Sequence, residues 1–305
     1  MPIIDVHAHH VPASVVRLVG YDTGRGGVMQ GDMVDLSVRI ADMDSQGVEM
    51  QAVSGVGGTF GRDLETARVF NDAMAESLAP YPDRFVGLAI APLAEPESAP
   101  SELERAVKDL GMRGVAIGTH VNGKNLDEPE FGAFFRKVEE LDIPMFIHPV
   151  SPQLGLERLG RYHLANLIGN VTETAVAAAS LIFGGVLDEF PRLKPYLAHG
   201  GGSCPYISGR WDQGWRSRGE GGMPDAPSAY LKRLYYDALT HSHQTLEYLV
   251  RFAGADHVML GSDYPYSMGH ADPVRQIESA PGLTDGEKRE VLSETASEMF
   301  KLSAG

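Results

Sequence analysis

The sequence lacks several features that would assign it to common protein classes. It has one cysteine, Cys204, so no internal disulfide can form, and we expect a reducing, cytoplasmic location. No run of about eighteen apolar residues occurs, which argues against a membrane-spanning helix. The first residues lack a basic segment followed by an apolar run, so a secretory signal is not expected. The formal net charge is −15, and no basic surface for a nucleic-acid partner is evident.

What the sequence does contain is a regular alternation of short apolar segments and helical patterns. Its 305 residues, 43% of them hydrophobic, suffice for a single domain spanning residues 1–305. Eight segments are short, apolar and rich in β-branched residues, which is typical of strands buried on both faces. The predicted strands are residues 3–7, 50–55, 85–92, 114–119, 144–149, 195–200, 234–240 and 257–263.

Helical spacing of apolar residues occupies the intervals between these strands. The predicted helices are residues 36–46, 63–78, 98–110, 130–141, 174–190 and 245–252. This order of elements favours an α/β fold, a (β/α)8 TIM barrel. An open, doubly wound sheet would instead place a glycine-rich phosphate turn after the first strand, where His7-Ala8-His9 stands. We expect loops at Gly20–Gly31, a candidate lid, and at Ser217–Pro227.

Polar residues stand at the carboxyl ends of several predicted strands, where TIM barrels build their sites. Strand one ends with His7 and His9, strand five with His148, strand six with His199 and strand eight with Asp263. A spacing of two residues places His7 and His9 on one face of the strand. Two adjacent neutral imidazoles can both donate lone pairs to a divalent cation.

His148 and Asp263 would complete a shell of three imidazoles and one carboxylate, with an open position for water. A lone histidine at a strand end is more often structural than a ligand. Four candidate ligands at the same end of three strands favour a catalytic metal site instead. His10 faces away from His9 and is left out of this shell.

Five segments together resemble the amidohydrolase superfamily, in its branch of α-amino-β-carboxymuconate-ε-semialdehyde decarboxylase and related non-oxidative decarboxylases. They are DVHAHH (5–10), RIADMDSQGV (39–48), IHP (147–149), LAHGGGSCPYISGRWD (197–212) and VMLGSDYPY (258–266). The resemblance implies a distorted, amidohydrolase-like TIM barrel with one divalent ion per subunit. Zinc is the expected ion and manganese the alternative.

The resemblance also implies roles for individual residues. The positions that match the family's metal ligands are His7, His9, His148 and Asp263. His199 matches the acid/base histidine, and we group it with Asp263 as catalytic. Arg210 matches an arginine that binds the substrate carboxylate in the neighbouring subunit's site, which implies a homodimer. Aromatic walls of the substrate site match Tyr162 or His163, and Tyr266.

Some positions differ from the family's patterns. Hydrolytic branches often bridge two metals with a carboxylated lysine at the end of strand four, whereas this strand ends Gly118-Thr119-His120, which favours one metal. The loop after strand one holds only Arg17 and Arg25, neither in a matching context for the decarboxylase's second substrate arginine. This difference weakens the case for the muconate-semialdehyde substrate. Arg39, at the start of a helix, is expected to form an ordinary salt bridge.

Three hypotheses of function follow. The first is a metal-dependent decarboxylase of a small aromatic or muconate-like carboxylate, in which Arg210 and the metal orient the acid and His199 takes part in protonating the carbon. The second is a hydrolase or hydratase that uses metal-bound hydroxide on a lactone, amide or unsaturated acid, since fold and ligands do not separate these chemistries. The third is a non-catalytic, metal-stabilised binding protein. No nucleic acid or membrane partner is expected for any of them.

Overall fold

Eight parallel strands form a single sheet whose order follows the chain from β1 to β8. The computed structural model describes residues 1–18, 31–219 and 222–302, so residues 20–30 of the candidate lid lie outside the described residues. The strands are β1 (Ile4–His9), β2 (Met50–Ser54), β3 (Phe85–Ile90), β4 (Gly114–Gly118), β5 (Pro144–His148), β6 (Lys194–Leu197), β7 (Tyr235–Asp237) and β8 (Val258–Met259).

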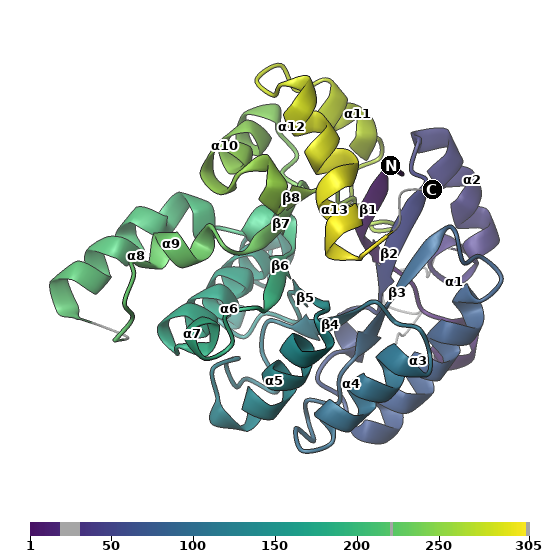
Figure 1. The fold of residues 1–305 in the computed structure, drawn as a ribbon, viewed down its shortest axis with the longest axis horizontal. Helices are drawn as coiled ribbons and strands as arrows, with labels where there is room; N and C mark the ends of the chain where they lie inside the picture. The colour runs from purple at the N-terminus through teal and green to yellow at the C-terminus, as the bar shows by residue number, and fades with distance from the viewer. Residues whose placement is uncertain (19–30, 220–221, 303–305) are drawn as a thin grey trace.

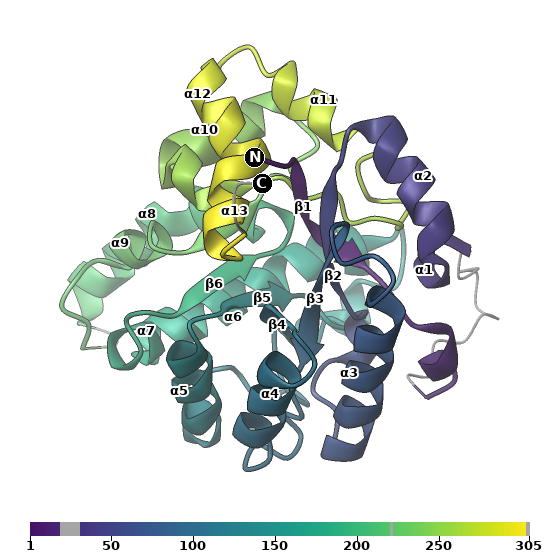
Figure 2. The ribbon, with the colours of Figure 1, turned by 45° about the vertical axis from the view of Figure 1, so that its right-hand side comes forward.

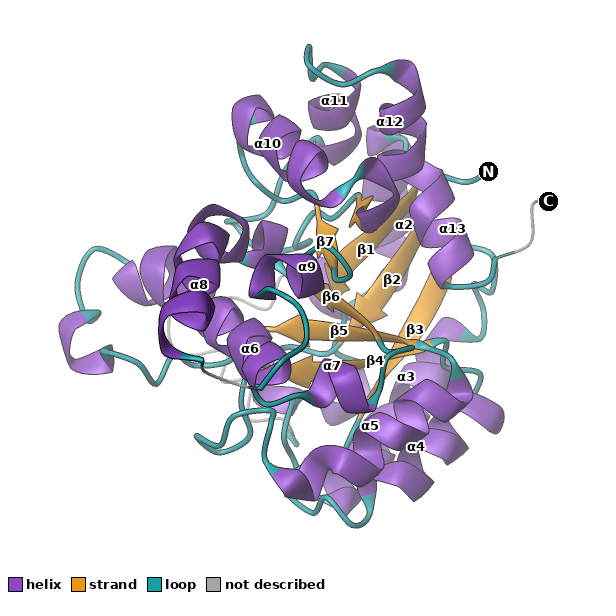
Figure 3. Ribbon diagram, turned by 60° about the vertical axis from the view of Figure 1, so that its left-hand side comes forward, coloured by secondary structure: helices purple, strands orange, loops and turns teal. Residues whose placement is uncertain are grey.

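Backbone hydrogen bonds between β1 and the segment around β8 close this sheet into a barrel. Val6 N donates to Leu260 O at 2.8 Å, and Asp263 N donates to His7 O at 2.7 Å. The strands lie enclosed by the helices, as Figure 3 shows. The predicted (β/α)8 TIM barrel is therefore confirmed.

Helices surround the barrel, and α8 and α9 project away from it on the left of Figure 1. The α-helices are α1 (Gly31–Val34), α2 (Leu36–Gln46), α3 (Leu64–Leu78), α4 (Ala99–Lys108), α5 (Gly132–Leu141), α6 (Val171–Phe183), α7 (Val186–Glu189), α8 (Cys204–Arg218), α9 (Pro227–Leu231), α10 (His243–Ala253), α11 (Pro273–Glu278), α12 (Asp285–Arg289) and α13 (Thr295–Met299). In Figure 2, α3, α4 and α5 stand side by side along the strands that they cover.

Within the described residues, eight shorter helical segments accompany these helices. The 3-10 helices are η1 (Ala13–Val15), η2 (Gly57–Thr59), η3 (Pro129–Phe131), η4 (Leu156–Arg158), η6 (His199–Gly201) and η7 (Ala255–His257). The π-helices are η5 (Ala165–Asn170) and η8 (Glu290–Glu294).

Two sequence predictions about helix bounds were wrong. The predicted helix at 174–190 is two helices, because the chain turns at Gly184 and at Gly185, which has a φ of +77°. The predicted loop at Ser217–Pro227 begins too early, since α8 continues to Arg218. Helix α2, by contrast, has the predicted bounds and ends at Gly47 in the left-handed conformation.

Aromatic rings fill the barrel interior directly beneath the strand-one histidines. The rings of Phe146 and Tyr196 stack at 4.5 Å, and the Phe146 ring lies 4.9 Å from that of His7. The Tyr196 hydroxyl donates to Val6 O at 3.2 Å. All of these residues are buried, so the histidines lie on a closely packed layer of aromatic side chains.

Two further expectations concern helix α6 and the single cysteine. Residues 165–183, which comprise η5 and α6, have the length and composition of a membrane span, and half of that window is buried inside the protein, so this one helix is weak evidence for a span. Cys204 is buried at the start of α8, and burial raises the pKa of its thiol to about 12, so it behaves as a small apolar residue.

Candidate active site

Four side chains from three strand ends converge at the carboxyl-terminal mouth of the barrel. His7 and His9 come from β1, His148 from the end of β5, and Asp263 from the segment after β8. One potential ligand atom from each lies within 4.8 Å of the others, and all four residues are buried. The four side chains that the sequence predicted to meet at the barrel mouth therefore lie close together in the structure.

The outer nitrogen of each imidazole is held by a hydrogen-bond acceptor. His7 Nδ1 lies 2.6 Å from Asp237 Oδ2, His9 Nδ1 lies 2.7 Å from Gly55 O, and His148 Nδ1 lies 2.9 Å from Pro149 O. Because these partners accept hydrogen bonds, each Nδ1 carries a proton, and the Nε2 of each neutral ring presents a lone pair to the centre.

The three Nε2 atoms point into the cluster. His7 Nε2 and His9 Nε2 face each other at 3.2 Å, and His148 Nε2 is buried without any hydrogen-bond partner. Asp263 Oδ1 lies 3.2 Å from His7 Nε2 and 3.1 Å from His9 Nε2. Three imidazole nitrogens and one carboxylate oxygen aimed at one point fit a divalent cation.

The electrostatics of the cluster support the same conclusion. Burial would lower the pKa of His7, but the charges of Asp263 and Asp237 outweigh it and raise that pKa to about 10. Burial lowers the pKa of His9 and of His148, so both stay neutral, as metal ligands must. Burial would raise the pKa of Asp263, but His7 and His199 hold it well below its usual range. In the protein alone, the extra proton on His7 thus balances the negative charges of Asp263 and Asp237. A bound cation can supply this positive charge instead.

Asp237, at the end of β7, is a residue that the sequence analysis missed. Its fully buried carboxylate accepts a hydrogen bond from His7 Nδ1. It also accepts from the backbone N–H of His199 at 2.8 Å and from that of Gly200 at 2.7 Å. Burial would raise its pKa, but the hydrogen bond and charge of His7 hold it below the usual value. A single acidic residue in the apolar segment 234–240 was the available signal.

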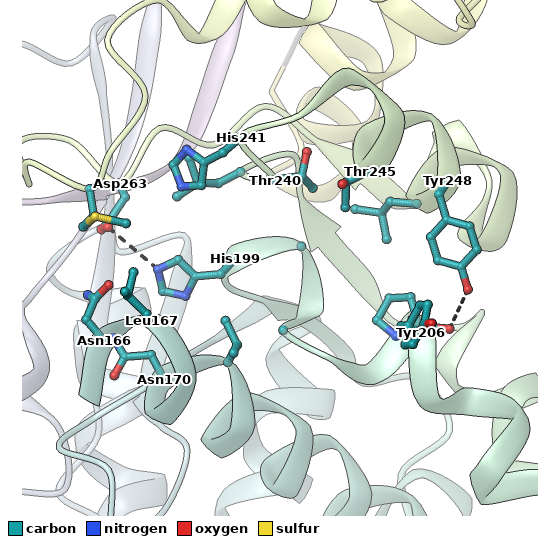
Figure 4. Close-up of a pocket in the computed structure, with 17 residues that line it drawn as sticks. Asn166, Leu167, Asn170, His199, Tyr206, Thr240, His241, Thr245, Tyr248 and Asp263 are labelled. Carbon is teal, nitrogen blue, oxygen red and sulfur yellow. Dashed lines mark hydrogen bonds and ion pairs between the residues drawn. The ribbon is translucent and has the colours of Figure 1, made fainter. Parts of the chain in front are cut away.

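His199 lies beside the cluster and faces open space. Its Nε2 is 3.7 Å from Asp263 Oδ2, a pair marked by the dashed line in Figure 4, and its Nδ1 is buried without a partner. Its backbone has a φ of +58°. The ring is therefore placed to exchange a proton with a molecule bound next to Asp263.

The glycines after His199 serve the tight turn rather than approach to a ligand. Gly202 has a φ of +59°, and a Cβ there would lie 2.3 Å from Val171 O. A Cβ at Gly201 would lie 2.5 Å from the Tyr236 ring. The sequence left open whether these glycines serve a turn or the approach of a ligand; the packing shows the turn, and Gly200 and Gly202 also line the smaller cavity.

A second buried network holds the backbone of β1. The Asp5 carboxylate accepts from Ser262 Oγ at 2.6 Å and from Gln51 Nε2 at 2.9 Å, and burial raises its pKa. Arg39, expected to form an ordinary salt bridge, is fully buried and donates to His9 O and to Gln51 Oε1. These contacts fix the strand from which His7 and His9 project.

Two adjoining cavities meet at His199 and Asp263, with volumes of about 700 and 330 Å³. The larger reaches from His148 to Phe60 and Tyr266. The smaller has a mostly apolar wall and runs toward α8 and α10, as Figure 4 shows.

The structure distributes the predicted substrate residues unevenly. Tyr266 lines the larger cavity with its ring 5.2 Å from that of His9. His163 also lines this cavity, whereas Tyr162 is 73% exposed and lines neither cavity. Arg210 is exposed on α8, in a separate surface pocket beside Phe183. Within one subunit, Arg210 therefore does not reach the cavities at His199.

Two further cavity residues were missed because only the fold identifies them. Asn166 and Asn170 of η5 line both cavities. The segment 151–170 was recognised as a polar loop with aromatics, but nothing in the sequence singled out these two positions.

Comparison with known proteins gives a matching family and three relatives. The protein-family model described as Amidohydrolase matches residues 4–302. The 2-amino-3-carboxymuconate-6-semialdehyde decarboxylase of Dictyostelium discoideum is 37% identical over 277 residues, which cover 88% of this chain and 77% of that protein. The crystal structure of 5-carboxyvanillate decarboxylase from Sphingomonas paucimobilis superposes with a TM-score of 0.89 and 29% identity, over 99% of each chain.

A third relative contains a metal. The structure of a dihydroxybenzoic acid decarboxylase from a Polaromonas species, with bound manganese and the inhibitor 2-nitroresorcinol, superposes with a TM-score of 0.88. It is 25% identical and covers 100% of this chain and 98% of that one.

The turn after His199 yields a testable prediction. Replacing Gly202→Ala forces a Cβ against Val171 O at a φ that alanine disfavours, so we expect a loss of about 2–4 kcal/mol in the free energy of unfolding. Urea unfolding measures this loss. Gly209→Ala in α8 is the matched control, because a Cβ there meets nothing within 4 Å. A Gly202→Ala variant as stable as the wild type contradicts the packing account.

Proposed function

The chain belongs to the amidohydrolase family, and from that membership we propose that it is a metal-dependent, non-oxidative decarboxylase of a small aromatic carboxylate. The observation that carries the proposal is the cluster of His7, His9, His148 and Asp263 beside His199, at the junction of two cavities. The named relatives support carbon–carbon lyase chemistry over hydrolysis or hydration, since each is a decarboxylase.

The residues suggest how the reaction proceeds. His7, His9, His148 and Asp263 would hold a divalent cation, which when bound would supply positive charge for the carboxylate of an acid. The bond between the ring carbon and the carboxylate breaks, CO2 leaves, and the electron pair stays on the carbon. His199 Nε2 delivers a proton to that carbon and recovers one from water. Tyr266 forms one wall beside the ring, and Phe146 with Tyr196 excludes water from below.

The test of the proposed function is CO2 release. We expect the metal-loaded enzyme to release CO2 from at least one member of a panel of hydroxybenzoates, carboxyvanillates and muconates, and no acid from lactones. His199→Ala should lower kcat by about 100-fold or more, because it removes the proton donor. Release of acid from lactones without CO2 from any carboxylate contradicts the proposal.

We propose one divalent ion per subunit. Zinc is the expected ion, since it favours imidazole ligands, and manganese is the alternative, supported by the manganese-containing Polaromonas relative. Metal analysis of the purified protein distinguishes the two ions.

Asp237 should control how tightly this ion binds. Asp237→Asn weakens the anchor of His7 Nδ1, so we expect metal affinity to fall about 10- to 100-fold, as measured by competition with a chelating dye. Asp83→Asn, at an exposed position, is the control and should leave affinity unchanged. Equal affinities for wild type and Asp237→Asn contradict the role assigned to Asp237.

We also propose a homodimer in which Arg210 completes the partner's site. Its support is the exposed position of Arg210 on the projecting helix α8, outside the cavities of its own subunit. The substrate is then held by a cluster from one chain and a guanidinium from the other.

Mixing two inactive variants tests this sharing. Arg210→Ala and His199→Ala should each be nearly inactive, and subunit exchange at equal amounts should restore about a quarter of wild-type activity, since half the dimers contain one complete site. No recovery after confirmed exchange contradicts shared sites, as does full activity of a strict monomer.

A further inference from the structure

The π-helix η5 places two carboxamides in the wall shared by both cavities. Asn166 and Asn170 are four residues apart, and each lines both the larger and the smaller cavity. Figure 4 shows them at the end of the pocket that holds His199 and Asp263, with Tyr206 and Tyr248 at the other end. Ile168, between them in sequence, is half-exposed. Short π-helical segments often occur at functional sites, where they redirect side chains.

Neither carboxamide is used by the protein itself. In the described part of the chain, the side chains of Asn166 and Asn170 make no hydrogen bond, although both residues are partly buried. Three other polar groups of these cavities are engaged: Gln153 Nε2 donates to Ser151 O, Thr240 Oγ1 to Ser242 O, and Tyr248 OH to Pro205 O. Two carboxamides without hydrogen-bond partners in the described part of the chain lie beside a candidate catalytic histidine and can therefore bind a ligand.

The charge of the cavity walls restricts what that ligand presents. Among the described residues, no lysine or arginine lines either cavity. A second carboxylate at this wall would therefore lack a cation within the subunit, at a large desolvation cost. A carboxamide both donates and accepts hydrogen bonds, and a hydroxyl group does the same.

We propose that Asn166 and Asn170 form a second polar subsite, which binds a neutral hydroxyl group of the substrate. The inference rests on the proposed function and narrows its substrate class to hydroxylated aromatic monocarboxylates. The carboxylate lies at the cluster of His7, His9, His148 and Asp263, and the hydroxyl lies against η5. The apolar wall of the smaller cavity, which includes Leu239 and Leu249, receives the ring's remaining substituents.

Equilibrium binding tests the subsite without relying on turnover. Calorimetry on the metal-loaded enzyme gives Kd for benzoate and for 2-, 3- and 4-hydroxybenzoate. We expect wild type to bind at least one hydroxy isomer about 10-fold more tightly than benzoate. In the Asn166→Leu/Asn170→Leu double variant, of similar side-chain volume, this preference should fall to about twofold or less while the Kd of benzoate stays within about twofold.

Controls separate binding from folding. Asn125→Leu, at an exposed position outside both cavities, should keep the wild-type preference. Thermal unfolding and metal content check the double variant, and if it does not fold, Asn166→Ala and Asn170→Ala should each reduce the preference about threefold or more.

The proposal is overturned if wild type shows no preference for any hydroxy isomer, or if the preference survives in the folded double variant. CO2 release is measured in parallel. An asparagine-dependent preference without any CO2 release would remove the decarboxylase assignment and leave the subsite standing. CO2 release without an asparagine-dependent preference would support the decarboxylase assignment and overturn the subsite.

Discussion

The Nε2 atoms of His7 and His9 face each other across 3.2 Å, and the site depends on the positive charge that lies between them. Each ring is held in this orientation through its Nδ1, which donates to Asp237 or to Gly55 O. Such a contact is favourable only with positive charge between the two nitrogens, which a proton supplies in the protein alone, because the pKa of His7 is raised to about 10. The barrel therefore stabilises an arrangement in which a cation can take the place of that proton.

A network of buried polar side chains holds His7 and His9 in these positions. Asp237 connects β7 to His7 and to the turn that carries His199, so one carboxylate positions both a candidate ligand and the candidate proton donor. Asp5 and Arg39 hold the backbone of β1 in place. All three charged groups are fully buried, and their cost is offset only because they hydrogen-bond to buried side chains and to the backbone.

The sequence predicted the barrel and the convergence of His7, His9, His148 and Asp263, because strand ends in a parallel barrel meet at one mouth. It did not predict the burial of Arg39, because a helix pattern does not reveal which neighbouring strand takes up a charge. Asn166 and Asn170 were missed because a π-helix changes which side chains share a face, and no short pattern encodes it. Arg210 and the dimer stay predictions, since they depend on contacts between subunits.

The central claim is that one divalent ion is bound by three imidazoles and a carboxylate. X-ray absorption spectroscopy of the manganese- or zinc-loaded protein tests it most directly, because imidazole rings give a distinct multiple-scattering pattern. The account predicts three imidazole nitrogens and at least one oxygen around a single ion, with the imidazole pattern weakened by about a third in His148→Ala. A shell of oxygens alone, or one that His148→Ala leaves unchanged, would place the ion elsewhere and contradict the account.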